Sequence, residues 1–201
     1  ERLVESAADY RNLIHSEYRY SLEDVVDLEA GMRLDFAFLG GMQIDKFGNV
    51  NMAMIGDWDH PKVRGPGTIG LIFLGGFRST YLYTQHHDPR ILVDKVDFVS
   101  GGGWLTGGDS RSKVFRPESS GPRLLFTPLG VFDFEPESKH MRLASTHPGV
   151  SVDDVRAKTG FDLMVADDVA ETAAPTDEEL RLLHERIDPD GVLHRMGAVP
   201  T

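Results

Sequence analysis

The chain has 201 residues, of which 40% are hydrophobic and 26% charged, with no cysteine and a formal net charge of −11 at pH 7. This length is enough for one α/β core, so we expect a single domain over residues 1–201, and the lack of cysteine excludes disulfides and thiolate ligands. The acidic balance argues against a nucleic-acid partner, and the absence of a long apolar run or a signal-peptide pattern predicts a cytoplasmic protein with no membrane partner.

Helix and strand patterns alternate along the chain. N-cap residues followed by apolar spacing indicate helices, and apolar runs bounded by turn residues indicate strands. The predicted elements are a helix at 21–31, a strand at 34–39, a turn at 45–48, strands at 49–55, 80–84, 124–127, 131–134 and 141–146, and helices beginning at Ser151 and Thr176. We therefore expect an α/β fold with a layered open sheet and flanking helices. The long loop at 101–122 is expected to be mobile or folded against a partner.

Two glycine-rich segments lie close together in the sequence and are predicted to line one crevice. Glycine serves where backbone must come close to another group or take a positive φ. In the first segment, residues 40–51, Asp45 and Asn49 are predicted to hold a tight turn through side-chain hydrogen bonds. Gln43 and Asn51 are instead predicted to face a ligand.

The second segment, residues 63–70, indicates more clearly what kind of ligand it could bind. Arg64 places a permanently charged guanidinium beside Gly65 and Gly67, which flank a proline. The N–H groups of such a loop can turn toward an anion or a developing oxyanion. We predict that Arg64, Gly65, Gly67 and Thr68 contact an anionic ligand. The glycine spacing matches neither a Walker loop nor the dinucleotide fingerprint.

The remaining polar candidates are weaker. His86 and His87 are adjacent, so on a strand they point to opposite faces, and no metal site is expected there. His147 precedes a Pro-Gly turn and is predicted to satisfy a backbone carbonyl. Other cations near the second segment are expected to be ordinary surface charges: Lys62, Arg78 and Arg90.

The segment 40–67 resembles the beta-subunit core of the family I coenzyme A transferases, most closely the glutaconate CoA-transferase type. Further motifs occur in the same order as in that family, so the resemblance covers about residues 21–191. These motifs are Val93–Val99, Gly130–Phe134, Met141–Leu143, His147–Val150, Thr159–Leu163, Pro175–Leu180 and Ile187–Pro189. The family loop usually has glycine where this chain has Thr68, which weakens the prediction that this position stabilises an oxyanion.

The resemblance implies a mechanism and a partner. In the family a glutamate carboxylate attacks an acyl-CoA thioester, and CoA then passes through a glutamyl thioester to an acceptor acid. The coenzyme A thioester is thus a substrate, and no permanently bound cofactor is implied. An alpha subunit is implied as partner, in a heterodimer or heterotetramer. Apolar residues predicted to meet that partner are the run 69–74 and Phe77, Tyr81, Tyr83 and Trp104.

The expected nucleophile cannot be assigned from this sequence. In the glutaconate type it lies in a glycine-containing motif ahead of the segment that matches residues 40–51. Here the acidic candidates before that segment are Glu1, Glu5 and Glu17, and none has the expected glycine neighbours. Two explanations remain open. Either the chain lacks an N-terminal strand and helix that carry the glutamate, or it belongs to an offshoot that hydrolyses CoA thioesters of steroid-ring fragments. A subunit that only completes a partner's site is a further alternative.

Overall fold

The computed structural model describes residues 3–4 and 9–195, which form two units. The smaller unit comprises the described parts of residues 1–21 and 173–201. Its helices are η1 (Tyr10–Leu13), α3 (Asp177–Leu182), the π-helical η4 (Leu183–Ile187) and α4 (Val192–Arg195). Thr176 and Glu179 form the capping box that the sequence predicts for α3. The single domain over residues 1–201 stays a prediction. Among the described residues, no helix is both long and apolar enough to cross a membrane.

The larger unit runs from Leu22 to Thr172 and contains the sheets. Its helices are α1 (Leu22–Ala30), η2 (Ile69–Gly76), η3 (Arg111–Lys113) and α2 (Val152–Lys158). Its strands are β1 (Leu34–Leu39), β2 (Gln43–Asp45), β3 (Val50–Asn51), β4 (Met54–Gly56), β5 (Pro61–Arg64), β6 (Phe77–Tyr83), β7 (Leu92–Val93), β8 (Pro122–Thr127), β9 (Gly130–Phe134), β10 (Met141–Thr146) and β11 (Met164–Glu171).

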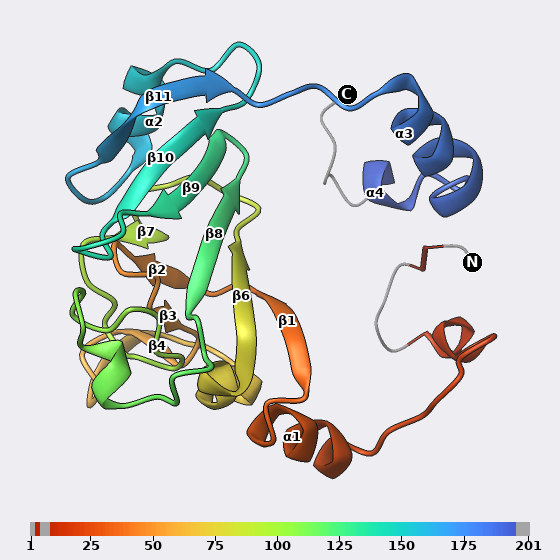
Figure 1. The fold of residues 1–201 in the computed structure, drawn as a ribbon, viewed down its shortest axis with the longest axis horizontal. Helices are drawn as coiled ribbons and strands as arrows, with labels where there is room; N and C mark the ends of the chain where they lie inside the picture. Colours follow the sequence, from red (N-terminus) through yellow and green to blue (C-terminus); the bar gives the residue numbers. More distant parts are fainter. Residues whose placement is uncertain (1–2, 5–8, 196–201) are drawn as a thin grey trace. The chain divides into compact units, whose positions relative to one another are not determined.

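A mixed six-stranded sheet organises this unit, in the order β1-β6-β8-β9-β10-β11 (Figure 1). Strands β1, β6 and β8 are parallel, β9 is antiparallel to both neighbours, and β11 is parallel to β10. A small sheet in the order β3-β2-β7 and the β4–β5 hairpin are separate from it. The predicted layered α/β fold is confirmed.

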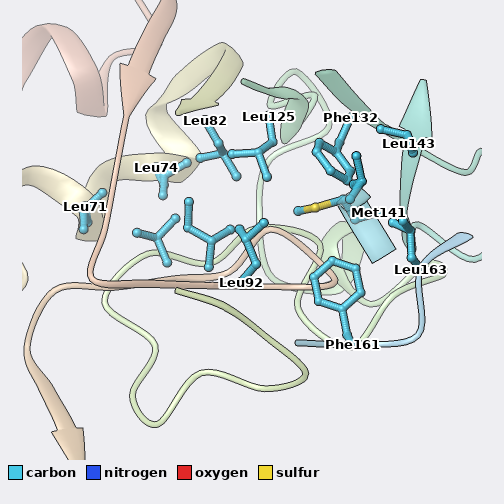
Figure 2. Close-up of a cluster of buried hydrophobic side chains, with 13 residues drawn as sticks. Leu71, Leu74, Leu82, Leu92, Leu125, Phe132, Met141, Leu143, Phe161 and Leu163 are labelled. Atoms are coloured by element: carbon cyan, nitrogen blue, oxygen red, sulfur yellow. The ribbon is translucent and has the colours of Figure 1, made fainter. Parts of the chain in front are cut away.

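The hydrophobic core lies on one face of the six-stranded sheet. Residues of four neighbouring strands, Leu82, Leu125, Phe132 and Leu143, are fully buried there. They pack in one cluster with side chains of the small sheet, η2 and α2, and Figure 2 shows these side chains converging. Because successive strand residues point to opposite faces, Phe36 and Phe38 on β1 lie on the other face, where they are exposed.

Local rules account for most elements, with one clear exception. Helix α2 begins at a capping box in which Ser151 and Asp154 each accept the other's backbone N–H. The predicted strand at 49–55 is wrong as a single element, because β3 and β4 are separated. The cause is Asn51, whose Oδ1 accepts the N–H of Ala53 at 3.0 Å and whose Nδ2 donates to the Met54 carbonyl at 2.7 Å. This side-chain turn interrupts the extended backbone.

The prediction of an apolar partner contact is wrong for several residues. Leu71, Leu74 and Phe77 are buried in the chain's own core, at 5%, 1% and 5% exposure. The Trp104 indole donates to the Pro122 carbonyl at 3.0 Å, but its side chain is only half-buried, so its contact with a partner stays a prediction. The side chains of Ile69 and Phe73 lie outside the described part. Of the remaining predicted contacts, Ile72 and Tyr83 are exposed.

Candidate functional site

The turn between β2 and β3 is held by its own side chains. The Asp45 carboxylate accepts the N–H groups of Phe47 and Asn49, both at 3.0 Å, and the Asn49 side-chain amide at 3.0 and 3.1 Å. The Gly48 N–H donates to the Asp45 carbonyl at 2.8 Å. The prediction that Asp45 and Asn49 hold this turn is confirmed.

Burial affects the ionisation of Asp45. Its removal from water raises the pKa of the carboxyl, and the hydrogen bonds from Asn49 and Phe47 oppose that rise because they favour the charged form. A cavity of about 400 Å³ opens beside this turn, with Phe47, Val96 and Leu105 in its lining. That volume lies in the range of small-molecule sites.

Asn49 also fastens the long loop to the hairpin. Its Oδ1 accepts the N–H of Gly103 at 2.9 Å and of Leu105 at 3.1 Å, and its Nδ2 donates to the Leu105 carbonyl at 2.8 Å. These bonds hold Leu105 at a φ of 55°, a left-handed conformation that is uncommon for a residue with a side chain. The loop is therefore folded against its own chain. The sequence pattern predicted a mobile loop or one folded against a partner, and did not indicate this arrangement.

Arg111 is a second anchor of this loop. It is 2% exposed, and its guanidinium donates to the carbonyls of Gly102 at 2.7 Å and Gly103 at 2.6 Å and to the Ser119 hydroxyl at 2.6 Å. The Phe115 ring lies 4.2 Å from it. Burial lowers the pKa of Arg111 to about 10, and its Nε has no hydrogen-bond partner among the described residues. Sequence reasoning missed Arg111, because no local pattern distinguishes it from a surface cation.

Gln43 and Asn51 are adjacent in the structure but bind protein groups. The Asn51 Nδ2 donates to the Gln43 Oε1 at 2.7 Å. The Gln43 Nε2 donates to the Asp97 carboxylate at 3.0 Å, and the Gly56 N–H donates to the same carboxylate oxygen at 2.8 Å. Gln43 and Asn51 are 5% and 0% exposed. Their contact with a ligand stays a prediction, and Asp97 is a partner that the sequence did not reveal.

The second glycine-rich segment follows β5. The Gly65 N–H donates to the Ala53 carbonyl at 2.9 Å, and the Gly67 N–H to the Met52 carbonyl at 3.3 Å. A Cβ on Gly65 would lie 2.2 Å from the Met52 carbonyl oxygen, whereas Gly67 has a φ of +98° and open space around it. Both N–H groups are thus used within the chain.

Arg64 and Thr68 border this loop. Arg64 is exposed, and its guanidinium donates to the Trp58 carbonyl at 3.4 Å. Thr68 is the N-cap of η2, but its side chain makes no capping hydrogen bond. The structure therefore places the loop against residues 52–53, directly after Asn51, while the Gln43 and Asn51 amides bind elsewhere. Ligand contacts of Arg64, Gly65, Gly67 and Thr68 stay predictions.

The histidines bind structural partners. The His87 ring nitrogens lie 2.9 Å from the Thr127 hydroxyl and 3.0 Å from the Thr159 hydroxyl, and burial lowers its pKa to about 4. The His147 Nε2 lies 3.0 Å from the Thr127 carbonyl, which confirms its predicted role. Within the described ranges, no group of three or more acidic, histidine or cysteine side chains is arranged to hold a metal. The three cations expected at the surface are exposed: Lys62, Arg78 and Arg90.

Comparison with known proteins decides the family. The model of the coenzyme A transferase family matches residues 4–158. The chain belongs to the coenzyme A transferase family. It is 40% identical over 153 residues to the B-type subunit of glutaconate CoA-transferase from Acidaminococcus fermentans, covering 76% of this chain and 57% of that one. It is 39% identical to the B-type subunit of 3-oxoadipate CoA-transferase from Pseudomonas knackmussii, with 76% and 58% covered.

Other comparisons extend this family relationship. The cholesterol ring-cleaving hydrolase IpdB subunit of Mycobacterium tuberculosis is 34% identical, over 78% of this chain and 62% of that one. The crystal structure of glutaconate CoA-transferase from Acidaminococcus fermentans superposes with a TM-score of 0.84 and 34% identity, covering 94% of this chain and 74% of that one. The chain thus spans about three fifths of the length of the curated relatives it matches, at 57%, 58% and 62%.

Proposed function

We propose that this chain is the beta-type subunit of an enzyme that transfers coenzyme A from an acyl-CoA to a free carboxylic acid, of which a dicarboxylic acid is the preferred candidate. The observation that carries the proposal is the 40% and 39% identity to the B-type subunits of two CoA-transferases. The coenzyme A thioester acts as substrate, and the partner is an alpha-type subunit in a heterodimer or heterotetramer. A cytoplasmic location is part of the same proposal.

Arg64 is the described residue best suited to bind an anionic substrate in this loop. Its guanidinium is exposed and permanently charged, so it can bind a substrate carboxylate or a coenzyme phosphate with two parallel hydrogen bonds. The adjacent Gly67 leaves open space beside the backbone. The N–H groups of Gly65 and Gly67 already have carbonyl acceptors, so we assign the anion contact to the Arg64 side chain.

No residue of this chain is assigned as the nucleophile. Glu17 is exposed, while Glu1 and Glu5 lie outside the described residues.

The test is to assemble the chain with its alpha-type partner and follow both products of acyl-CoA consumption. A transferase yields a new acyl-CoA in proportion to the acyl-CoA consumed, and only when an acceptor acid is present. Free CoA formed at the rate of thioester loss, with no acceptor gaining it, would contradict transfer. That result would favour the hydrolase alternative, which the 34% identity to the IpdB subunit supports.

Arg64 provides a residue-level prediction. Arg64→Ala is expected to reduce kcat/KM in the assembled enzyme by the equivalent of about 2–5 kcal/mol, because its charge-assisted pair with the substrate is lost. Arg64→Lys keeps the positive charge but loses the two parallel N–H donors of the guanidinium, so it is also expected to impair turnover strongly. Lys62→Ala, an exposed cation of the same strand, is the matched control and should leave kcat/KM unchanged. Near-normal kinetics for both Arg64 variants would remove it from the site, and a large fall in Tm would assign it a structural role.

A further inference from the structure

The turn between β4 and β5 displays a tryptophan on a preformed support. Trp58 is 55% exposed, although tryptophan usually buries most of its surface. Its ring is stacked on Phe98, with centroids 5.1 Å apart and an angle of 26° between the planes. The exposed ring is therefore braced by a second ring, which reduces the side-chain entropy lost when a ligand binds.

Arg64 completes this arrangement. Its guanidinium carbon lies 5.7 Å from the centre of the Trp58 ring, and its Nη2 donates to the Trp58 carbonyl at 3.4 Å. The same cation that adjoins the glycine-rich loop is thus attached to the aromatic pair. The turn itself is acidic, because Asp57 and Asp59 precede and follow Trp58, and the Asp57 carboxylate accepts the Asp59 N–H at 2.9 Å. Trp58 is thus flanked in the sequence by two carboxylates and contacted by one cation.

This arrangement matches one part of a coenzyme A substrate. A flat base stacks well on a braced aromatic ring, and a guanidinium binds phosphate oxygens with paired hydrogen bonds. The exocyclic amino group of a purine can donate a hydrogen bond to a carboxylate. Phosphates are repelled by a carboxylate because both are negatively charged. A base stacked on Trp58 would therefore bring its amino group near the acidic turn, and its phosphates would bind the Arg64 guanidinium.

We propose that Trp58, braced by Phe98, is the platform for the adenine base of the coenzyme A substrate, with Arg64 at its phosphates. This inference rests on the proposed function and names the residues that bind the nucleotide end of the substrate. Trp58 is a binding residue here, and no chemical step is assigned to it.

A comparison of two thioesters tests the proposal in the enzyme assembled with its partner subunit. Kinetics are measured with an acyl-CoA and with the matching acyl-pantetheine, which lacks the nucleotide. Trp58→Ala is expected to lower kcat/KM for the acyl-CoA roughly 5- to 150-fold, the range that corresponds to loss of one base–aromatic stack, and to leave acyl-pantetheine unchanged. Trp58→Phe should retain most of the activity. Phe36→Ala removes another exposed aromatic ring and is the matched control. Equal losses of kcat/KM with both thioesters in Trp58→Ala, or no loss with either, would contradict the proposal that Trp58 binds the adenine base.

A binding measurement separates failure of the platform from failure of the proposed function. Fluorotryptophan is incorporated into this chain, and the Trp58 and Trp104 signals are assigned in the assembled complex by Trp58→Phe and Trp104→Phe. Adenosine 3′,5′-bisphosphate is expected to shift the Trp58 signal in the fluorine NMR spectrum and to leave the Trp104 signal in place. If the enzyme turns over acyl-CoA but the nucleotide causes no shift, the platform is wrong and the proposed function stands. If the shift occurs without CoA transfer, the platform stands and the transferase function is wrong. No shift, together with loss of assembly in Trp58→Ala, would make Trp58 an anchor for the partner subunit instead.

Discussion

Replacing Asn49 with alanine is expected to lower the free energy of unfolding by about 3–5 kcal/mol. The substitution leaves the N–H groups of Gly103 and Leu105 without their acceptor, and the Leu105 carbonyl without its side-chain donor. It also removes the side-chain donor from the Asp45 carboxylate, which keeps the N–H groups of Phe47 and residue 49. Each buried polar group left without a partner costs about 1–3 kcal/mol, and water entering the vacated space keeps the total below the full sum.

The assay is urea unfolding of the full chain combined with amide hydrogen exchange. In Asn49→Ala the amides of Gly103 and Leu105 should lose protection far more than amides of the six-stranded sheet, because the loop is released before the core opens. A loss of stability below about 1 kcal/mol, or unchanged protection at both amides, would refute the reasoning.

Asn49→Asp is the informative second variant. It keeps an oxygen for the two loop N–H groups but places a carboxylate beside Asp45, which raises a carboxyl pKa in the folded state through like-charge repulsion. A folded-state pKa raised above the unfolded value means that the folded protein binds more protons, so stability falls as pH rises through that interval. The variant should therefore approach wild-type stability at about pH 4 and be much less stable at about pH 8. The opposite trend would mean that the two side chains are not in contact.

Three further substitutions test other parts of the structure. Arg111→Lys should cost about 2–4 kcal/mol in thermal or urea unfolding, because lysine cannot make all three charge-assisted hydrogen bonds, whereas the exposed Arg116→Lys should change stability by less than about 0.5 kcal/mol. Gly65→Ala should cost about 1–3 kcal/mol because its Cβ would meet a carbonyl oxygen at 2.2 Å, while Gly70→Ala, with open space around its Cβ, should not destabilise the fold. Because the pKa of His87 is lowered to about 4 from 6.5, the unfolded state takes up its proton first as pH falls. His87 should therefore remove up to about 3 kcal/mol of stability between those pH values, and this part of the pH dependence should be absent in His87→Gln.

Local sequence patterns predicted what depends on neighbouring residues. The strands at 34–39, 131–134 and 141–146 appear at the predicted positions, and the capping boxes begin α2 and α3. The side-chain bonds within the turn at 45–49 were also predictable. In each case the interacting groups are only a few residues apart, so intrinsic preferences and short-range hydrogen bonds suffice.

The family resemblance was carried by ordered motifs, and the match over residues 4–158 confirms it. The short strands around residues 50–56 could not be predicted as separate elements. Asn51 ends the extended backbone there, because its side chain hydrogen-bonds backbone groups two and three residues ahead. Such local side-chain bonds compete with the hydrogen bonds of a continuous strand, so the sequence pattern does not show which of the two forms.

The amino-acid sequence by itself thus determined the alternation of elements, the tight turn and the family, because each depends on local pattern or on motif order. Only the tertiary structure decided where the polar groups bind. The partner of Gln43 is Asp97, and Asn49 binds Leu105, residues 54 and 56 positions away. The N–H groups of Gly65 and Gly67 are used by carbonyls of the preceding segment, although the glycine pattern alone suggested donors for a ligand. A hydrogen bond forms with whichever acceptor the packed backbone brings within about 3 Å, and the local sequence does not specify that distance.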